Sequence, residues 1–320
     1  MFLSKEIRSN HLYQVLKLLR VRQWIKNLAL FAAITFAGEL FNIPIFLEVF
    51  WGFIAFSFIA SATYIANDLV DVGKDKLHPF KKTRPIASGK ISQREAVLLF
   101  IILLIAGFGI ALTLNPLFVL LLIVYVSLQV LYSLSLKSIA ILDIMVIASG
   151  YIIRVFAGDA ISGYHISVWL ILTAISLSLF LAVGKRRSEL TLLKNHQGAK
   201  IEEVRKTLSH YSESLLDAFI TMFAASTFIF YAMFTFIENA GGIKITFAPL
   251  LPEFLPYYLQ RKWLMITIIP VIYGIMKYLQ VIYEKSEGES PERVLYSEKS
   301  LLTGVVVWVL LVIFVLYFLS

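Results

Sequence analysis

The sequence has no cysteine and little charge. With no cysteine among its 320 residues, the chain has no disulfide, no thiolate metal site and no cysteine nucleophile. Its five histidines show no metal-ligand spacing, which argues against a zinc site. Only 16% of the residues are charged, whereas about 25% is usual in soluble globular proteins. Water is therefore not the main solvent of this chain.

Apolar residues are abundant and occur in long runs. The chain is 59% hydrophobic, with a mean hydropathy of +0.80. A membrane-spanning helix needs about 20 mostly apolar residues, and continuous runs of this kind argue against a β-barrel. We predict an all-α polytopic membrane protein with one domain over residues 1–320, because no linker divides it. The nine predicted transmembrane helices are 24–42, 46–66, 95–114, 116–134, 140–160, 166–184, 214–237, 263–283 and 300–319.

The net charge of +8 follows the loops between these helices. In membrane proteins a basic excess usually marks cytoplasmic loops, so it does not indicate a nucleic-acid partner. Lysine and arginine gather in the N-terminus and in segments 67–95, 185–213 and 284–299. With nine helices these segments share one side. We therefore predict a cytoplasmic N-terminus and an external C-terminus in the plasma membrane.

An acidic run follows the second predicted helix. At about 100° per residue, its four oxygen-bearing residues lie within an arc of roughly 100° on one helix face. Oxygen ligands suit Mg²⁺, which typically uses one or two carboxylates together with substrate phosphates. The sequence therefore indicates a metal–phosphate site at a membrane boundary. The four residues are Asn67, Asp68, Asp71 and Asp75.

Basic residues follow the acidic run at once. Lys81, Lys82 and Arg84 come after a His-Pro pair that is expected to end the helix. A metal with neighbouring cations neutralises a diphosphate leaving group from two sides. The alternative is a solvated loop of mixed charge. The arrangement of the acidic residues on one face favours the phosphate site.

A second polar cluster lies around the fifth predicted helix. If that helix starts at residue 140, Arg154 lies about 21 Å along it, which is too deep for its side chain to reach the cytoplasm easily. Arg154 must then face a polar cavity or pair with Asp143 or another acid. We favour a phosphate ligand, because the guanidinium fork matches phosphate oxygens, and a structural ion pair is the alternative. Lys137 is either part of this site or a basic anchor.

A third cluster begins with Lys185 and Arg186 and continues as an amphipathic stretch through Tyr211. The alternative for this stretch is an interfacial helix on anionic lipid headgroups. In the first predicted helix, Lys26 and Asn27 are placed to point into the same cytoplasmic cavity.

Together these stretches resemble a known family. The motif Asn-Asp-x-x-Asp-x-x-x-Asp, extended by His-Pro-x-Lys-x-x-Arg-Pro and followed by Tyr-Ser-x-x-x-Lys, is similar to the UbiA superfamily of intramembrane prenyltransferases. The resemblance is closer to the decaprenyl-phosphate phosphoribosyltransferase (5-phosphoribosyl-1-diphosphate synthase) branch. It implies nine helices around a central cavity open to the cytoplasmic side. The stretches are 20–27, 67–89, 132–158 and 184–211, with a weaker match at 290–302.

One departure from the ordinary family pattern matters. Aromatic prenyltransferases of the superfamily carry a second Asp-rich motif after the fourth helix, for a second metal. Here Lys137 and a lone Asp143 stand in that place. One acidic cluster can hold the metal for one diphosphate, and cations in the second position suit another phosphate. Phosphoribosyl pyrophosphate has both groups.

The resemblance implies a reaction and a set of residues. A phosphoribosyl group would pass from phosphoribosyl pyrophosphate to a polyprenyl phosphate, with Mg²⁺ as cofactor and diphosphate as the product. By position, Asn67 and Asp71 are the first candidates for metal ligands, followed by Asp68 and Asp75, and the three aspartates are the catalytic residues. Lys26, Tyr64, Lys81, Arg84, Lys137 and Arg154 would hold the donor, and Lys185 and Arg186 the acceptor phosphate.

Two other functions stay open at this point. A UbiA enzyme that moves a prenyl chain from prenyl diphosphate to an aromatic or small polar acceptor shares the fold, but the missing second Asp motif argues against it. A transporter would place ions near the membrane midplane, whereas most charge here lies at the cytoplasmic ends. Membrane lipids are expected partners. Small and aromatic residues on the helices leave a homo-oligomer open.

Overall fold

The chain folds as a bundle of helices. The computed structural model describes residues 10–77, 81–195, 206–237, 263–285, 294–295 and 297–319, and all regular elements in these ranges are helical. Within them, eight helices are long and apolar enough to cross a membrane. Their cores are α4 (Ile43–Val70), α6 (Gln93–Leu112), α7 (Pro116–Leu134), α8 (Leu142–Ser162), α9 (Val168–Asn195), α11 (Glu213–Ile237), α13 (Ile268–Gln280) and α15 (Lys299–Phe314).

Short elements complete the bundle. They are α2 (His11–Leu19), η1 (Val21–Phe31), α3 (Ala32–Phe36), α5 (Val72–Leu77), η2 (Lys81–Thr83), η3 (Leu136–Ser138), η4 (Lys206–His210), η6 (Trp263–Thr267), η7 (Val281–Lys285) and η8 (Val315–Leu319).

Local signals explain where the long helices begin. The side chain of Ser92 accepts a hydrogen bond from the Glu95 backbone N–H at 3.2 Å and starts α6. Asn115 caps α7 in the same way, and Pro116 occupies its first turn, where the missing N–H costs nothing. The predicted boundaries of these two helices are therefore close to the observed ones.

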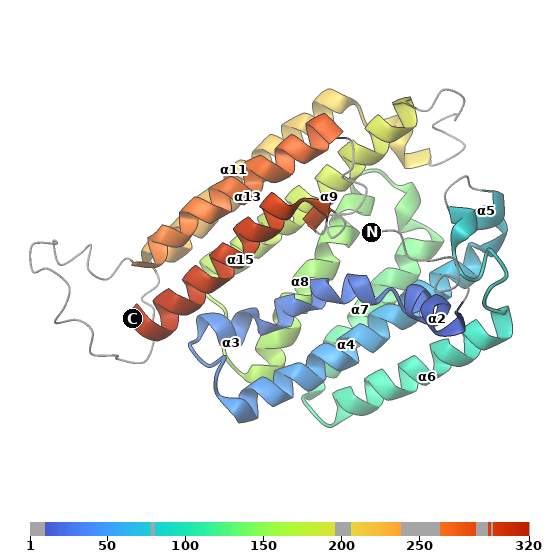
Figure 1. The fold of residues 1–320 in the computed structure, drawn as a ribbon, viewed down its shortest axis with the longest axis horizontal. Coiled ribbons are helices and arrows are strands. Elements are labelled where there is room, and N and C mark those ends of the chain that lie inside the picture. The colour runs from blue at the N-terminus through green and yellow to red at the C-terminus, as the bar shows by residue number, and fades with distance from the viewer. Residues whose placement is uncertain are drawn as a thin grey trace, which may run out of the picture.

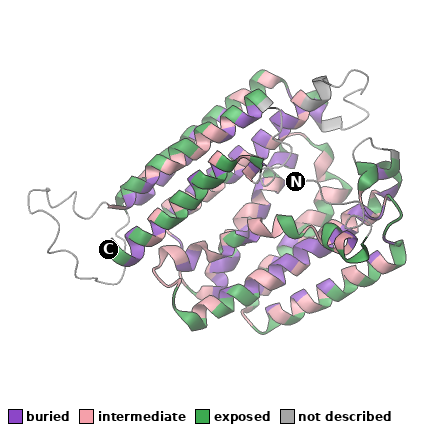
Figure 2. Cartoon of the chain, in the orientation of Figure 1, coloured by how far each residue is buried: buried purple, intermediate pink, exposed green. Residues whose placement is uncertain are grey.

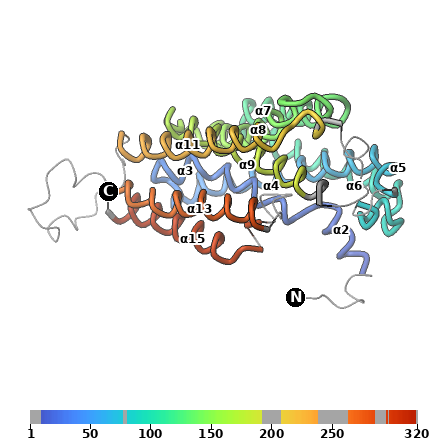
Figure 3. Tube along the Cα trace, turned by 90° about the horizontal axis from the view of Figure 1, so that it is seen from above, coloured from blue at the N-terminus to red at the C-terminus, as the bar shows by residue number. Residues whose placement is uncertain are grey.

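The helices form two groups around a buried middle. In Figure 1, α11, α13 and α15 lie on one side of the bundle, and α4 and α6 lie on the other. Helices α8 and α9 join the groups, and seen from above, α7 and α8 lie opposite α13 and α15 (Figure 3). Figure 2 shows buried residues concentrated on α4, α8 and α9, with exposed residues along the outward faces of α6 and α11.

The first predicted membrane segment, 24–42, takes an unexpected form. It is the 3₁₀-helix η1 followed by the short helix α3, so it is absent from the eight long helices. At about 2.0 Å per residue in η1 and 1.5 Å in α3, the two together still extend over roughly 30 Å, the thickness of the hydrocarbon core. Helix α2 lies at the same end of the bundle as α5, and the C-terminus lies at the other end (Figures 1 and 3). This arrangement supports an odd number of passes, and the count of nine stays a prediction.

A glycine brings η1 close to α8. A Cβ atom at Gly158 would lie 1.9 Å from the carbonyl oxygen of Leu30 and 2.7 Å from its carbonyl carbon. No real Cβ atom approaches a backbone so closely, so only glycine fits here. Because η1 also packs against α4, residues 20–27 lie between the two helices that carry the predicted site.

Candidate active site

The acidic run lies where α4 passes into α5. The backbone N–H of Asp71 donates to the backbone carbonyl oxygen of Asn67 at 3.0 Å. The backbone N–H of Asp75 donates to the backbone carbonyl oxygen of Asp71 at 2.8 Å. The helical hydrogen bonding therefore continues across the junction and keeps the run on one side of the chain. Asp71 lies between the last residue of α4 and the first residue of α5, and His78 and Pro79, which were expected to end the helix, lie outside the described residues.

Two of the acids are buried and bound to arginine. One guanidinium nitrogen of Arg84 lies 2.7 Å from Asp75 and 3.0 Å from Asp68, and Arg20 donates to the same Asp68 oxygen at 2.6 Å. Asp68 and Asp75 are each 3% exposed. Buried carboxylates need such partners, because an unpaired charge in a low dielectric is costly. Asp68 and Asp75 thus join α4 and α5 to η2 and to the start of η1.

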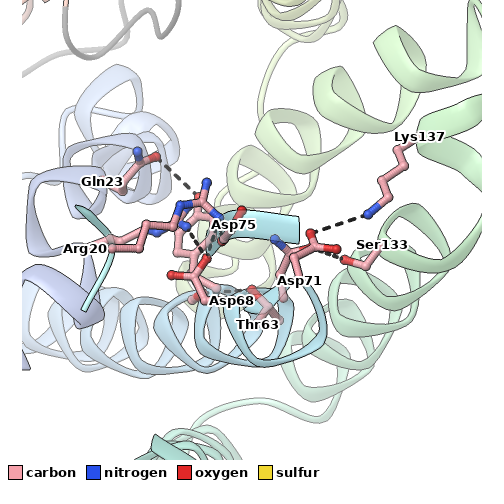
Figure 4. Close-up of polar contacts among 12 residues, drawn as sticks. Arg20, Gln23, Thr63, Asp68, Asp71, Asp75, Ser133 and Lys137 are labelled. Atoms are coloured by element: carbon pink, nitrogen blue, oxygen red, sulfur yellow. Dashed lines mark hydrogen bonds and ion pairs between the residues drawn. The ribbon is translucent and has the colours of Figure 1, made fainter. Parts of the chain in front are cut away.

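The other two residues of the run face α7. Ser133 donates to the Asn67 side-chain oxygen at 3.0 Å, and the Lys137 ammonium lies 3.5 Å from Asp71. The side chain of Asp71 is 18% exposed, so it is more open than Asp68 or Asp75. Figure 4 shows the separation: Arg20 and Gln23 lie on one side of the aspartates, and Ser133 and Lys137 lie on the other.

Lys26 and Tyr64 meet at Gln23. The Gln23 side-chain oxygen accepts from Lys26 at 2.7 Å and from the Tyr64 hydroxyl at 3.4 Å. The Arg20 guanidinium lies 4.7 Å from the centre of the Tyr64 ring. The predicted residues of η1 and α4 therefore come together at the end of the bundle that holds the acidic run.

Arg154 is buried without a carboxylate. It donates to Asn27 at 2.6 Å, to Tyr125 at 3.2 Å and to the backbone oxygen of Gly150. Its guanidinium also lies 5.0 Å from the Phe56 ring centre. Among the described residues, no acid forms an ion pair with it, so the structure does not show the structural ion pair that was the alternative to a phosphate ligand. Neutral acceptors and aromatic faces offset the loss of water only in part, and the positive charge is retained.

Arg186 is the opposite case. It is fully buried, its Nε lies 3.1 Å from Asp143, and another nitrogen contacts Glu189. Asp143, which the sequence offered as a partner for Arg154, is therefore bound to Arg186 instead. The neighbouring Lys185 is half-buried on α9, and Lys81 is exposed in η2. The predicted contacts of these basic residues with substrate stay predictions.

Arg20 and Gln23 were missed as site residues. Both lie in the stretch 20–27, and Arg20 was counted only as a loop charge. Its backbone has a φ of +51°, which turns the chain between α2 and η1 and directs the side chain to Asp68. The available signal for Arg20 was its charge at the start of the stretch 20–27, which resembles the family. The spacing along the sequence does not show that Asp68 is its partner.

The donor set fits a hard cation that shares its ligands with a substrate. No group of three acidic or histidine residues forms a ready-made metal site within the described part of the chain. Mg²⁺ does not need such a group, since it commonly takes one or two protein carboxylates and completes its shell with phosphate and water. Asp71 and Asn67 offer one carboxylate and one amide oxygen on the more open side of the run.

Comparisons with known proteins match nearly the whole chain. A sequence model of the UbiA prenyltransferase family matches residues 28–297. The "Decaprenyl-phosphate phosphoribosyltransferase" of Corynebacterium glutamicum is 31% identical over 95% of this chain and 86% of its own length. The protein of the same name from Mycolicibacterium smegmatis is 32% identical over 92% of this chain and 90% of its own length.

A solved structure shares the fold. The UbiA homolog from Archaeoglobus fulgidus bound to GPP and Mg²⁺ superposes with a TM-score of 0.66 at 19% identity, and the match covers 95% of this chain and 99% of that one. With eight long apolar helices in the part of it that the structure describes, the chain is a multi-pass membrane protein. The family model matches residues 28–297, and the relatives align over most of their own length and of this chain. This chain therefore belongs to the UbiA prenyltransferase family.

Proposed function

We propose that this chain transfers a 5-phosphoribosyl group from phosphoribosyl pyrophosphate to a polyprenyl phosphate of the decaprenyl type and releases diphosphate. The observation that carries the proposal is the match of 31–32% identity to relatives named "Decaprenyl-phosphate phosphoribosyltransferase" over at least 92% of the chain. The position of Lys137, 3.5 Å from Asp71, supports it, since a cation stands where ordinary family members have a second acidic motif.

The proposed reaction depends on the positioning of donor and acceptor more than on a strong base. An oxygen of the acceptor phosphate forms a bond to ribose C1, and the bond from C1 to the diphosphate oxygen breaks with its electron pair on the diphosphate. The attacking oxygen is already anionic, so no proton has to be removed from it. The protein must hold two anions close together and offset the charge that grows on the leaving group.

Asn67 and Asp71 are the residues that would hold Mg²⁺. When bound there, the ion would draw charge from the leaving diphosphate. Asp68 and Asp75 have a different task in this proposal, because Arg20 and Arg84 bind one oxygen of Asp68, and Arg84 also binds one oxygen of Asp75. They hold these arginines at the edge of the metal site, where the guanidinium groups face the same substrate.

The donor would lie between α4, α7 and η1. Lys137 and Lys26 stand on two sides of the acidic run, and Arg154 lies deeper, with a charge that no acid among the described residues balances. Tyr64, Lys81 and Arg84 complete the donor side of the proposed site, and Lys185 and Arg186 remain assigned to the acceptor phosphate. We place the site on the cytoplasmic side of the plasma membrane, because the basic loops gather at that end of the helices.

The test is a transfer assay with purified protein. Phosphoribosyl pyrophosphate labelled in the ribose is incubated with polyprenyl phosphate and Mg²⁺, and we expect label to enter the lipid phase. The variant Asp71→Ala is expected to remain folded and lose nearly all turnover. Label that stays in water, together with transfer of a prenyl chain from prenyl diphosphate to an aromatic acceptor, would contradict the proposal and favour the ordinary family reaction.

A further inference from the structure

The link between α7 and α8 contains a strained turn. Ile141 has a φ of +69° and a ψ of −49°, and the backbone N–H of Leu142 donates to the carbonyl oxygen of Ala140 at 2.9 Å. This is a γ-turn with positive φ at its centre, a conformation that costs energy for any residue with a Cβ and most for a β-branched one. Such a turn persists only where its surroundings hold it.

Tyr211, which lies between η4 and α11, holds the turn. Its hydroxyl accepts a hydrogen bond from the Ile141 backbone N–H at 2.6 Å and donates one to Asp143 at 2.6 Å. Burial and the hydrogen bond to Asp143 raise the pKa of Tyr211, so the hydroxyl keeps the proton that it donates. One atom therefore fixes the residue at the centre of the turn and the first acid of α8.

Tyr211 is itself held firmly. It is 5% exposed and belongs to a core cluster with Leu208 and Leu216, which are 2% and 0% exposed. Ile144 of α8 and Val294 belong to the same cluster. A hydroxyl carried by such a well-packed ring has little freedom to follow the turn if the turn relaxes. The tyrosine sets the position of the turn, and not the reverse.

The strained turn separates two charged contacts. Four residues before it, Lys137 lies 3.5 Å from Asp71. Two residues after it, Asp143 pairs with Arg186 at 3.1 Å. Relaxation of the turn would shift the short segment that carries Lys137, because α7 and α8 are long, packed helices on either side of it.

We propose that Tyr211 is a positioning residue, whose hydroxyl keeps the Ile141 turn in its strained form and thereby holds Lys137 against Asp71. The link to donor binding rests on the function proposed above, whereas the link between Tyr211 and the turn does not. The two parts can therefore fail separately.

The first experiment removes one oxygen atom. In Tyr211→Phe we expect faster amide exchange over residues 139–143, because the Ile141 N–H loses its acceptor. We expect the KM for phosphoribosyl pyrophosphate to rise about tenfold with a smaller change in kcat. The matched control is Tyr317→Phe, which also removes a hydroxyl that accepts from a backbone N–H, that of Leu40 at 2.7 Å, at the other end of the bundle. Tyr317→Phe should change neither the amide exchange over residues 139–143 nor the KM for phosphoribosyl pyrophosphate.

The second experiment removes the strain. Glycine adopts a φ of +69° at no steric cost, so Ile141→Gly needs no clamp to keep the turn. In the double variant Tyr211→Phe/Ile141→Gly we expect at least half of the loss in donor KM to be recovered. The double variant also covers the case in which Tyr211→Phe alone fails to fold, since relief of strain should then restore folded protein.

Two results would overturn the proposal. Unchanged exchange over 139–143 in Tyr211→Phe would show that the hydroxyl does not hold the turn. A double variant no better than Tyr211→Phe would show that strain at Ile141 is not what the tyrosine opposes. The amide exchange measurement requires no substrate. If the wild-type protein transfers no phosphoribosyl group, the proposed function is wrong, but the exchange experiment still tests whether the Tyr211 hydroxyl holds the Ile141 turn.

Discussion

Two arginines are buried on neighbouring helices, and they have opposite surroundings. Arg154 of α8 donates to an amide, a phenol and a backbone carbonyl, whereas Arg186 of α9 lies between Asp143 and Glu189. Their exposed fractions are 4% and 0%. Arg154 has a hydrogen bond from each of its three guanidinium nitrogens, whereas Arg186 has its charge balanced by two acids. The comparison separates a cation whose charge is open to an anionic ligand from one whose charge two carboxylates already offset.

The largest expected effect comes from Arg186→Met. It leaves Asp143 and Glu189 without their cation in a buried place, and we expect the free energy of unfolding to fall by about 3–5 kcal/mol. Thermal unfolding in detergent measures this loss. The control is Arg94→Met at the exposed start of α6, which should stay within about 0.5 kcal/mol of wild type. Equal free energies of unfolding in Arg186→Met and Arg94→Met would show that Arg186 has no structural role.

Arg154→Met should act on the ligand more than on the fold. Its partners are neutral, so its loss leaves no buried charge behind. We expect the dissociation constant for phosphoribosyl pyrophosphate to rise about 100-fold, roughly 2.7 kcal/mol, with a smaller change in unfolding temperature than in Arg186→Met. A binding isotherm and a melting curve on the same preparation decide it. Lost stability with donor affinity intact would make Arg154 a structural residue after all.

The balance around Arg186 can be tested by removing the acid as well. Asp143→Asn in the Arg186→Met background takes away one unpaired charge and keeps an acceptor for Tyr211. We expect it to recover about 1–3 kcal/mol of the lost unfolding free energy. Additive losses in the double variant would show that the two side chains do not depend on each other.

The smallest effect should come from Arg154→Lys. Lysine keeps the charge and loses the planar fork that contacts Asn27 and Tyr125. We expect donor affinity to fall about tenfold, between wild type and Arg154→Met. Affinity as low as in Arg154→Met would mean that hydrogen-bonding geometry, and not charge, is what the donor requires.

Hydropathy was enough to predict most of the helices. The predicted 116–134 coincides with α7, because Asn115 and Pro116 start it where the apolar run begins. The segment 24–42 was expected as an ordinary helix, since hydropathy does not distinguish a 3₁₀-helix from an α-helix. The close packing of η1 against Gly158 of α8 is a contact between residues far apart in the sequence, which hydropathy does not report.

The members of the site could be predicted better than their pairing. Periodicity placed the four residues of the acidic run on one face, but Asp68 and Asp75 contact arginines, whereas Asn67 and Asp71 contact Ser133 of α7 and Lys137 of η3. Long basic side chains reach several neighbours, so spacing along the chain does not decide which acid each one meets. Asp143 shows this most clearly: it lies on the same helix as Arg154 and pairs with Arg186 of the next.

The 3₁₀ winding of η1 also sets the length that this segment spans. Its 11 residues rise about 2.0 Å each, so rewinding them as an α-helix would shorten the segment by roughly 5.5 Å, about one helical turn. Asn27 now donates to Ser57 of α4 at 2.8 Å and accepts from Arg154 of α8 at 2.6 Å. A slip of one turn would break both hydrogen bonds together. The pitch of one short segment thus decides whether two long helices share a common polar contact.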